Sequence, residues 1–223
     1  MKAIQKLTPS LIVTAIVCGG IVTVPGMAHA ELTGNVGVTS NYIWRGVTQT
    51  SDASAISGGL DYAHASGFYI GTWVSNTVAN QYEHDVYLGY GFDAGPVGLD
   101  IGALKYIYPV GTVLSDFTEV YVNASYSNFG IGVAYTVDKE DSAITEENDI
   151  YVYASAEFEV KKDLALGLLI GDYDVDGGSA GDYTHYQLSL SKDDFTFAYN
   201  KNDQNGNAGD ARITASWSKN FDL

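Results

Sequence analysis

The chain has 223 residues, of which 46% are hydrophobic and 17% charged, and its formal net charge at pH 7 is −16. Such an acidic chain is a poor partner for nucleic acid, because lysine and arginine contacts to phosphates supply most of that affinity. The single cysteine, Cys18, excludes a fold held together by disulfide bonds.

The first thirty residues have the features of a secretory signal peptide. Two lysines near the start precede a mostly apolar stretch at residues 11 to 24, and a small-x-small cleavage site follows at residues 28 to 30. The apolar stretch is short and interrupted by glycine, unlike a membrane-spanning helix. We therefore predict a cleaved signal peptide over residues 1–30 and one exported domain over residues 31–223.

Alternation of bulky and small residues marks the strands of this domain. From Phe129 to Val137, large apolar side chains at odd positions alternate with Gly, Ala or Thr at even positions, which is typical of a strand with two unlike faces. The same reading along the chain predicts twelve strands. They cover residues 34–45, 55–64, 67–75, 84–93, 96–107, 117–127, 129–138, 149–160, 163–172, 183–192, 194–201 and 211–220.

Connections between these predicted strands alternate in length, beginning with a long one. The tight ones are Ala65-Ser66, Ala94-Gly95, Asn128, Lys161-Lys162 and Asp193. A membrane barrel with an even number of strands has short periplasmic turns and longer outer loops, whereas a β-sandwich has no reason to alternate. The pattern favours an all-β fold, an antiparallel up-and-down transmembrane barrel of about twelve strands.

Polarity supports the same interpretation. The face opposite the bulky one carries mostly small or neutral groups, such as Gly89 and Gly91, rather than the Lys, Glu and Thr that a solvated sheet face carries. Three tryptophans, Trp44, Trp73 and Trp217, lie near strand ends, as aromatic girdles do in membrane barrels. We expect the cell outer membrane of a Gram-negative envelope, and the alternative is a soluble barrel with a ligand cavity.

One segment resembles a known family. The resemblance rests on residues 34 to 76 and is carried by Ser40-Asn41-Tyr42-Ile43-Trp44-Arg45-Gly46-Val47-Thr48-Gln49-Thr50, Gly58-Gly59-Leu60-Asp61-Tyr62 and Ser66-Gly67-Phe68-Tyr69-Ile70-Gly71-Thr72-Trp73-Val74-Ser75-Asn76. This stretch resembles the opening block of the TorF family of proteobacterial outer-membrane porin-like proteins, whose function is largely undefined. Ser54 departs from the pattern, where a proline is expected, as does the ending Phe221-Asp222-Leu223. The resemblance implies an outer-membrane barrel and names no solute.

If the bulky face meets lipid, the other parity lines the lumen. The charged candidates on that face are Arg45, Arg212, Asp85, Glu119, Asp61 and Asp100. Arg45 ends the first predicted strand and Arg212 begins the last, so barrel closure is expected to bring both near the outer rim, level with Asp85 and Glu119. Basic groups facing acidic ones would create a transverse field that selects solutes. Alternatively the arginines only neutralise carboxylates, which is the interpretation we favour.

Two further motifs are weaker. Asp172, Asp174 and Asp176, followed by a glycine, copy the first half of a calcium loop, but Tyr183 stands where the motif requires a bidentate Glu. An acidic outer loop is the preferred interpretation. His185 with Ser189 or Ser191 would suggest a phospholipase, as in some twelve-stranded outer-membrane enzymes, yet parity places all three inside. We therefore expect neither an enzyme nor a cofactor.

The resulting expectation is a porin for passive diffusion of ions or small polar solutes, with a cation preference set by the acidic charge. The alternative is a non-conducting barrel, its lumen filled by charge pairs and by Tyr87, Tyr121, Tyr151 and Tyr153, with a structural or adhesion role through acidic outer loops. Expected partners are outer-membrane lipid, lipopolysaccharide and, during insertion, the barrel-assembly machinery. None of the long connections stands out as an inward-folded loop, and a monomer is the default.

Overall fold

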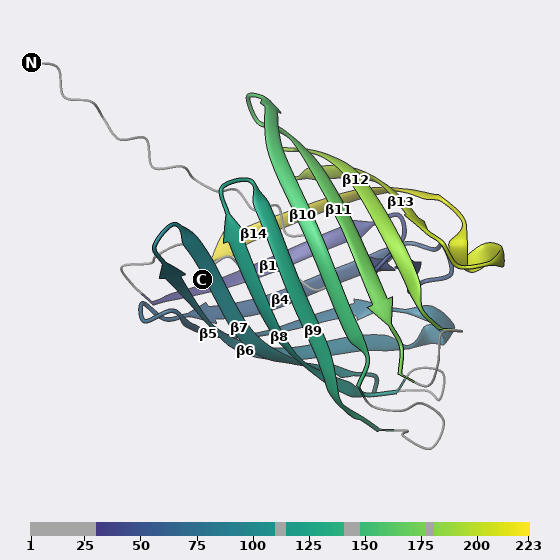
Figure 1. Ribbon diagram of the computed structural model, residues 1–223, viewed down its shortest axis with the longest axis horizontal. Helices are drawn as coiled ribbons and strands as arrows, with labels where there is room; N and C mark the ends of the chain where they lie inside the picture. The colour runs from purple at the N-terminus through teal and green to yellow at the C-terminus, as the bar shows by residue number, and fades with distance from the viewer. Residues whose placement is uncertain (1–29, 110–114, 141–147, 177–180) are drawn as a thin grey trace, which may run out of the picture.

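The computed structural model describes residues 30–109, 115–140, 148–176 and 181–223, and it is a closed antiparallel β-barrel (Figure 1). Each barrel strand pairs with its neighbours along the chain, and pairing of the first strand with the last closes the cylinder. The twelve barrel strands are β1 (Glu31–Thr39), β4 (Ala55–Ala63), β5 (Phe68–Asn76), β6 (Tyr82–Ala94), β7 (Val97–Ile107), β8 (Phe117–Tyr126), β9 (Phe129–Lys139), β10 (Ile150–Lys161), β11 (Leu164–Asp174), β12 (Tyr183–Lys192), β13 (Phe195–Asn202) and β14 (Arg212–Asp222). The predicted fold class is confirmed, while nearly all of the predicted signal peptide lies outside the described residues.

The remaining elements are small. A two-stranded hairpin, β2 (Ile43–Trp44) with β3 (Val47–Thr48), lies between β1 and β4. Two short 3-10 helices, η1 (Val78–Asn80) and η2 (Gly206–Gly209), lie in later connections. Across the described residues, no helix is long and apolar enough to cross a membrane.

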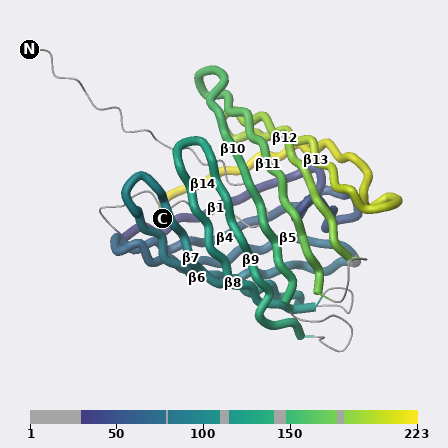
Figure 2. The backbone as a smooth tube through the Cα atoms, viewed as in Figure 1, coloured from purple at the N-terminus to yellow at the C-terminus, as the bar shows by residue number. Residues whose placement is uncertain are grey.

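The alternation of connections is confirmed. Because consecutive strands are antiparallel, the tight turns gather at one end of the barrel and the long connections at the other, which the backbone trace makes visible (Figure 2). At the tight end, Gly67 adopts φ +98, a conformation that only glycine reaches without strain. Space excludes a side chain there as well, because a Cβ would lie 2.1 Å from the carbonyl oxygen of Gly91.

The first strand differs from its prediction. The expected strand over residues 34–45 ends at Thr39, six residues early, and Arg45 is therefore not in the barrel wall. The Thr39 hydroxyl donates to the carbonyl oxygen of Asn41 at 2.9 Å, and the amide of Asn41 points back to the same hydroxyl at 3.4 Å. Ser40 still bonds to Ala215 of β14, and beyond it these local bonds accompany the turn of the chain away from the wall.

The outer surface of the barrel is apolar along its strands. In β9 the side chains of Phe129, Ile131 and Val133 are exposed, whereas Ala134 and Thr136 are buried, as the sequence parity predicts. Equivalent exposed positions occur around the barrel, among them Leu32, Ile56, Leu60, Ile70, Leu88, Ile101, Val122, Val152, Leu168, Ile170, Leu188, Phe197 and Ile213. A continuous apolar exterior on a closed barrel is the architecture of an outer-membrane protein, and it excludes the soluble-barrel alternative.

The tryptophan girdle is only partly as expected. Trp217 pairs with Val38 and Phe195, which are both exposed, and so lies on the outer face. Trp73 pairs with the buried Asp85 and so faces the lumen, and Trp44 lies inside the barrel. Two of the three tryptophans therefore pack in the interior rather than at the membrane interface.

The lipid-facing assignment predicts a depth-dependent effect of charge. Val133 is exposed near the middle of β9, so Val133→Arg should lower the free energy of unfolding in lipid vesicles by about 2–4 kcal/mol. Tyr126→Arg, at the end of β8, is the matched control and should cost about 0–1 kcal/mol because the strand end lies near the interface. Urea titration of vesicle-folded protein measures both, and equal costs would contradict the assignment.

Candidate functional site

The first outer connection, residues 40–54, folds into the barrel, and we call it the lumen hairpin. It forms hydrogen bonds with wall residues on widely separated strands. As donors, Tyr42 Oη bonds to Glu83 of β6 at 2.5 Å, Trp44 Nε1 bonds to Tyr106 of β7 at 3.4 Å, and Arg45 bonds to Glu119 of β8. As acceptors, the Gly46 carbonyl oxygen bonds to Asn202 of β13 at 2.8 Å, and Asp52 bonds to Arg212 of β14. The hairpin thus reaches across the lumen to the far wall. The expectation that no long connection folds inward is wrong.

The tip of the lumen hairpin is a tight turn at Arg45 and Gly46. Their φ values are 47 and 80, the pair of positive angles that a type I′ turn requires. A left-handed conformation costs a residue with a side chain about 1–2 kcal/mol. At Gly46 a Cβ would also lie 2.5 Å from the Cβ of His185, so only glycine lets the tip approach this wall.

The Arg45 side chain is enclosed by one carboxylate and three aromatic rings, which we call the Arg45 cage. Its two terminal nitrogens donate to the two oxygens of Glu119 at 2.7 and 2.6 Å. The guanidinium carbon lies 4.3 Å from the Trp44 ring centre, 4.2 Å from Tyr151 and 5.1 Å from Tyr173. Bidentate pairing and cation–π contact together compensate a buried guanidinium.

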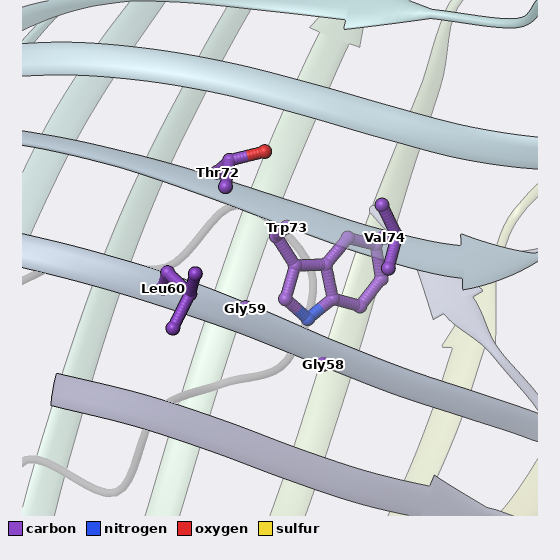
Figure 3. Close-up of a pocket in the computed structure, with 6 residues that line it drawn as sticks. All are labelled: Gly58, Gly59, Leu60, Thr72, Trp73 and Val74. Carbon is purple, nitrogen blue, oxygen red and sulfur yellow. The ribbon is translucent and has the colours of Figure 1, made fainter. Parts of the chain in front are cut away.

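Trp73 supports the start of the lumen hairpin. Its indole lies toward Gly58 and Gly59 on the neighbouring strand β4 (Figure 3). A Cβ on Gly59 would lie 3.3 Å from this indole and 2.6 Å from the carbonyl oxygen of Thr72, so the absence of a side chain at Gly59 makes room for the ring. On its other side Trp73 meets Tyr42 edge-on, with ring centres 5.5 Å apart. The wall therefore holds the hairpin by packing as well as by charge.

Arg212 fixes the other end of the lumen hairpin. Its Nε donates to Asp52 at 2.5 Å, and its remaining nitrogens donate to carbonyl oxygens of residues 207, 208 and 210. The hydrogen bond from Arg212 holds the pKa of Asp52 below its usual value. The sequence places both arginines together at the rim, but the structure places Arg45 at the hairpin tip, where the two arginines bind different carboxylates.

Acidic groups remain in excess beside the hairpin. Asp85 is 7% exposed and Glu83 is 1% exposed, and Glu83 accepts from Tyr42 and, at 2.8 Å, from Tyr108. One oxygen of Asp85 has no hydrogen-bond partner in the part of the chain that the structure describes. Asp85 and Glu119 are buried, at the inward parity that the sequence assigns to them, and Glu83, which shares the parity of Asp85, is not among the predicted candidates.

A second acidic level lies nearer the tight-turn end. Asp100 accepts from Tyr69 at 2.6 Å and from Asn123 at 3.2 Å, and Asp61 accepts from Asn35 and from the Tyr87 hydroxyl. The salt bridges of the described residues join Arg45 to Glu119, Lys139 to Asp149, Arg212 to Asp52 and Lys219 to Asp194. Among those residues, Asp61, Asp85, Asp100 and Glu83 therefore have no basic partner. Acidic side chains therefore outnumber their basic partners in the described part of the lumen.

The remaining predicted motifs are not assembled into sites. Asp172 accepts from Thr184 and Asp176 accepts from Asn148, and the described residues contain no group of three or more His, Cys, Asp or Glu able to hold a metal ion. His185 lies 2.9 Å from the Tyr151 hydroxyl. Ser191 instead meets Thr196, at 3.0 Å. Within the described ranges the phospholipase pair is therefore not formed.

Comparison with known proteins gives a family and a fold. A family model described as "Bacterial protein of unknown function (Gcw_chp)" matches residues 25–213. No curated protein sequence matches. Among solved structures, the KdgM porin is similar with a TM-score of 0.57 and 8% identity, covering 86% of this chain and 99% of that one. The KdgM porin in complex with disordered oligogalacturonate gives 0.55 and 7% identity over 86% and 99%. An outer-membrane channel from Pseudomonas putida F1 gives 0.50 and 12% identity over 87% and 97%.

Proposed function

Because the chain belongs to the Gcw_chp family of bacterial proteins of unknown function and forms a closed barrel with an apolar exterior, we propose that it is an outer-membrane channel for passive diffusion of small cations and small polar solutes. The observation that carries the proposal is the acidic lumen narrowed by the lumen hairpin. A loop folded into a barrel that carries charged groups sets both the width and the field of a pore.

The charge of the lumen supports a cation preference. Asp61, Asp85, Asp100 and Glu83 face inward without a basic partner among the described residues. Carboxylates along a narrow, low-dielectric passage attract cations and repel anions. The similar KdgM structure holds oligogalacturonate, an anion, but the likeness is one of fold, and the solute class here follows from the lumen charges.

The same hairpin favours a second candidate, a non-conducting barrel with a structural or adhesion role. Glu83, Tyr106, Glu119, Thr136 and Asn202 are each at most 2% exposed, so the lumen is tightly filled at the level of the hairpin. A channel then requires the hairpin to move or to leave a narrow path beside it. Conductance is the property that separates the two candidates.

Planar-bilayer recording of the purified protein tests the proposal. We expect discrete conductance steps. In a potassium chloride gradient, the sign of the reversal potential should show that potassium permeates more readily than chloride. Absence of steps from both the wild-type barrel and a variant lacking the hairpin would overturn the channel and leave the structural candidate.

We also propose which molecules surround the barrel and insert it. The apolar exterior fits outer-membrane lipid with lipopolysaccharide at the outer leaflet, and insertion would use the barrel-assembly machinery. The resemblance of residues 34–76 to the TorF family agrees with a porin-like role, and the finer family name is an inference from those residues.

A further inference from the structure

The Arg45 cage has the composition of a guanidinium-binding site. Glu119 supplies two parallel acceptors at 2.7 and 2.6 Å, a match for the fork of two N–H groups that a guanidinium presents and an ammonium does not. Tyr151 and Tyr173 supply ring faces at 4.2 and 5.1 Å. Tyr106 adds a hydroxyl 3.4 Å from Glu119 and orients that carboxylate.

Most of the cage and its occupant belong to different parts of the molecule, the exception being Trp44, which lies on the lumen hairpin beside Arg45. Glu119, Tyr106, Tyr151 and Tyr173 project from wall strands β8, β7, β10 and β11, whose ladders do not involve the lumen hairpin. Arg45 arrives from the hairpin tip with φ 47, a conformation that is unfavourable for arginine. If Arg45 were withdrawn, the wall would therefore keep the two Glu119 acceptors and the rings of Tyr151 and Tyr173, while Trp44 would leave with the hairpin.

The position of the cage also suits an entering solute. Tyr106 lies one residue before the outer end of β7, and Glu119 lies two residues after the outer start of β8. Asp85, one oxygen of which has no hydrogen-bond partner among the described residues, adds a further acidic group at the same level. A cation entering from the outer side would reach this level of the lumen before it reached the second acidic level, at Asp61 and Asp100.

We propose that the Arg45 cage is a binding site for solutes that carry a guanidinium group, and that Arg45 is its resident occupant while the hairpin lies in the lumen. Such solutes compete with Arg45 for Glu119 and so favour withdrawal of the hairpin. Only the competition with Arg45 rests on the proposed channel function, because binding of a solute to the vacated cage needs no conductance.

The first test measures binding without current. Purified Arg45→Ala is titrated with methylguanidinium or methylammonium while its thermal unfolding is followed. We expect stabilisation by methylguanidinium at a half-saturating concentration about tenfold lower than for methylammonium, because only the guanidinium pairs with both Glu119 oxygens. Arg45→Ala combined with Glu119→Gln should lose this difference. Equal responses to the two cations would overturn the site.

If Arg45→Ala does not fold alone, its folding from urea gives the same information. The yield of folded barrel should rise with methylguanidinium and not with methylammonium, and an equal yield with both would overturn the site. Lys219→Ala is the matched control, because its ion pair is exposed and remote from the cage, and neither cation should distinguish it from wild type.

The second test measures competition in the wild-type channel. Methylguanidinium added on the outer side should increase the open fraction relative to an equal concentration of methylammonium. An unchanged open fraction would overturn the competition, even where the first test supports the cage. A wild-type barrel that never conducts would instead count against the proposed channel function, and the binding measurement would still decide the cage.

Discussion

Replacement of residues 41–53 by Asn-Gly should turn a narrow or closed barrel into one that conducts severalfold more. Thr39 and Ala55 are cross-strand partners, so a two-residue turn after Ser40 can join β1 to β4 without disturbing the ladder. The lumen then loses Tyr42, Trp44 and Arg45 together, and a twelve-stranded wall encloses more space than its own side chains fill. Single-channel recording measures the change.

A connection at the opposite end of the barrel provides the control. Ser127-Asn128, the tight turn between β8 and β9, can be exchanged for the same Asn-Gly pair, and Ser127 already has a positive φ. That variant should keep the wild-type conductance. A hairpin replacement that folds, as judged by circular dichroism and by resistance of the barrel to denaturation in detergent, but conducts no better than wild type would contradict the assignment of the hairpin as the obstruction.

Arg45→Ala should change ion selectivity and stability at once. Removal of one partner from a buried ion pair costs about 3–5 kcal/mol, because the remaining charge is left without compensation. Here that charge is Glu119, whose side chain is 3% exposed, and it would add to the acidic groups that have no basic partner among the described residues. The reversal potential in a salt gradient should shift toward stronger cation preference, and the midpoint of urea unfolding should fall.

Two comparison variants separate the effect of the Arg45 charge on ion selectivity from its effect on the stability of the fold. Arg45→Lys keeps the positive charge but cannot pair with both oxygens of Glu119. Its ion selectivity should therefore remain near wild type, while its stability should lie between those of wild type and Arg45→Ala. Lys219→Ala breaks an exposed ion pair and should cost about 0–1 kcal/mol with no effect on selectivity. A folded Arg45→Ala with an unchanged reversal potential and reduced stability would leave Arg45 with a structural role alone.

The sequence contains enough information to predict the barrel wall. Bulky and small residues alternate along each strand, and the length of the connections alternates between ends, so strand number, end and inward face follow together. Parity also places Asp61, Asp85, Asp100 and Glu119 in the lumen. These features depend on local pattern and on the physics of a closed sheet in lipid, and both can be read from one chain.

The lumen hairpin could not be predicted by the same rule. Residues 42 to 45 continue the first strand with aromatic and β-branched side chains and with no turn residue until Gly46, so the predicted strand extends to Arg45. The departure depends on long-range contacts, from Arg45 to Glu119 and from Tyr42 to Glu83. An Arg-Gly pair is also a weaker turn signal than Asn-Gly, although both central residues have positive φ.

One of the matched segments of the sequence forms the feature that differs from the prediction. Residues 40 to 50, one of three segments that carry the resemblance to the TorF family, lie in the lumen hairpin rather than in a strand and its outer loop. Aromatic residues near a predicted strand end are typical of a membrane girdle. Inside the barrel, Trp44 forms one wall of the Arg45 cage instead.

The most direct test of the account is the reversal potential of the wild-type protein and of the hairpin replacement, measured in the same potassium chloride gradient. We predict conductance in both, larger in the replacement, with a reversal potential of cation-selective sign in each because the wall carboxylates are present in both. A replacement barrel that folds but does not conduct, or that prefers chloride, would contradict the account of an acidic pore narrowed by the lumen hairpin.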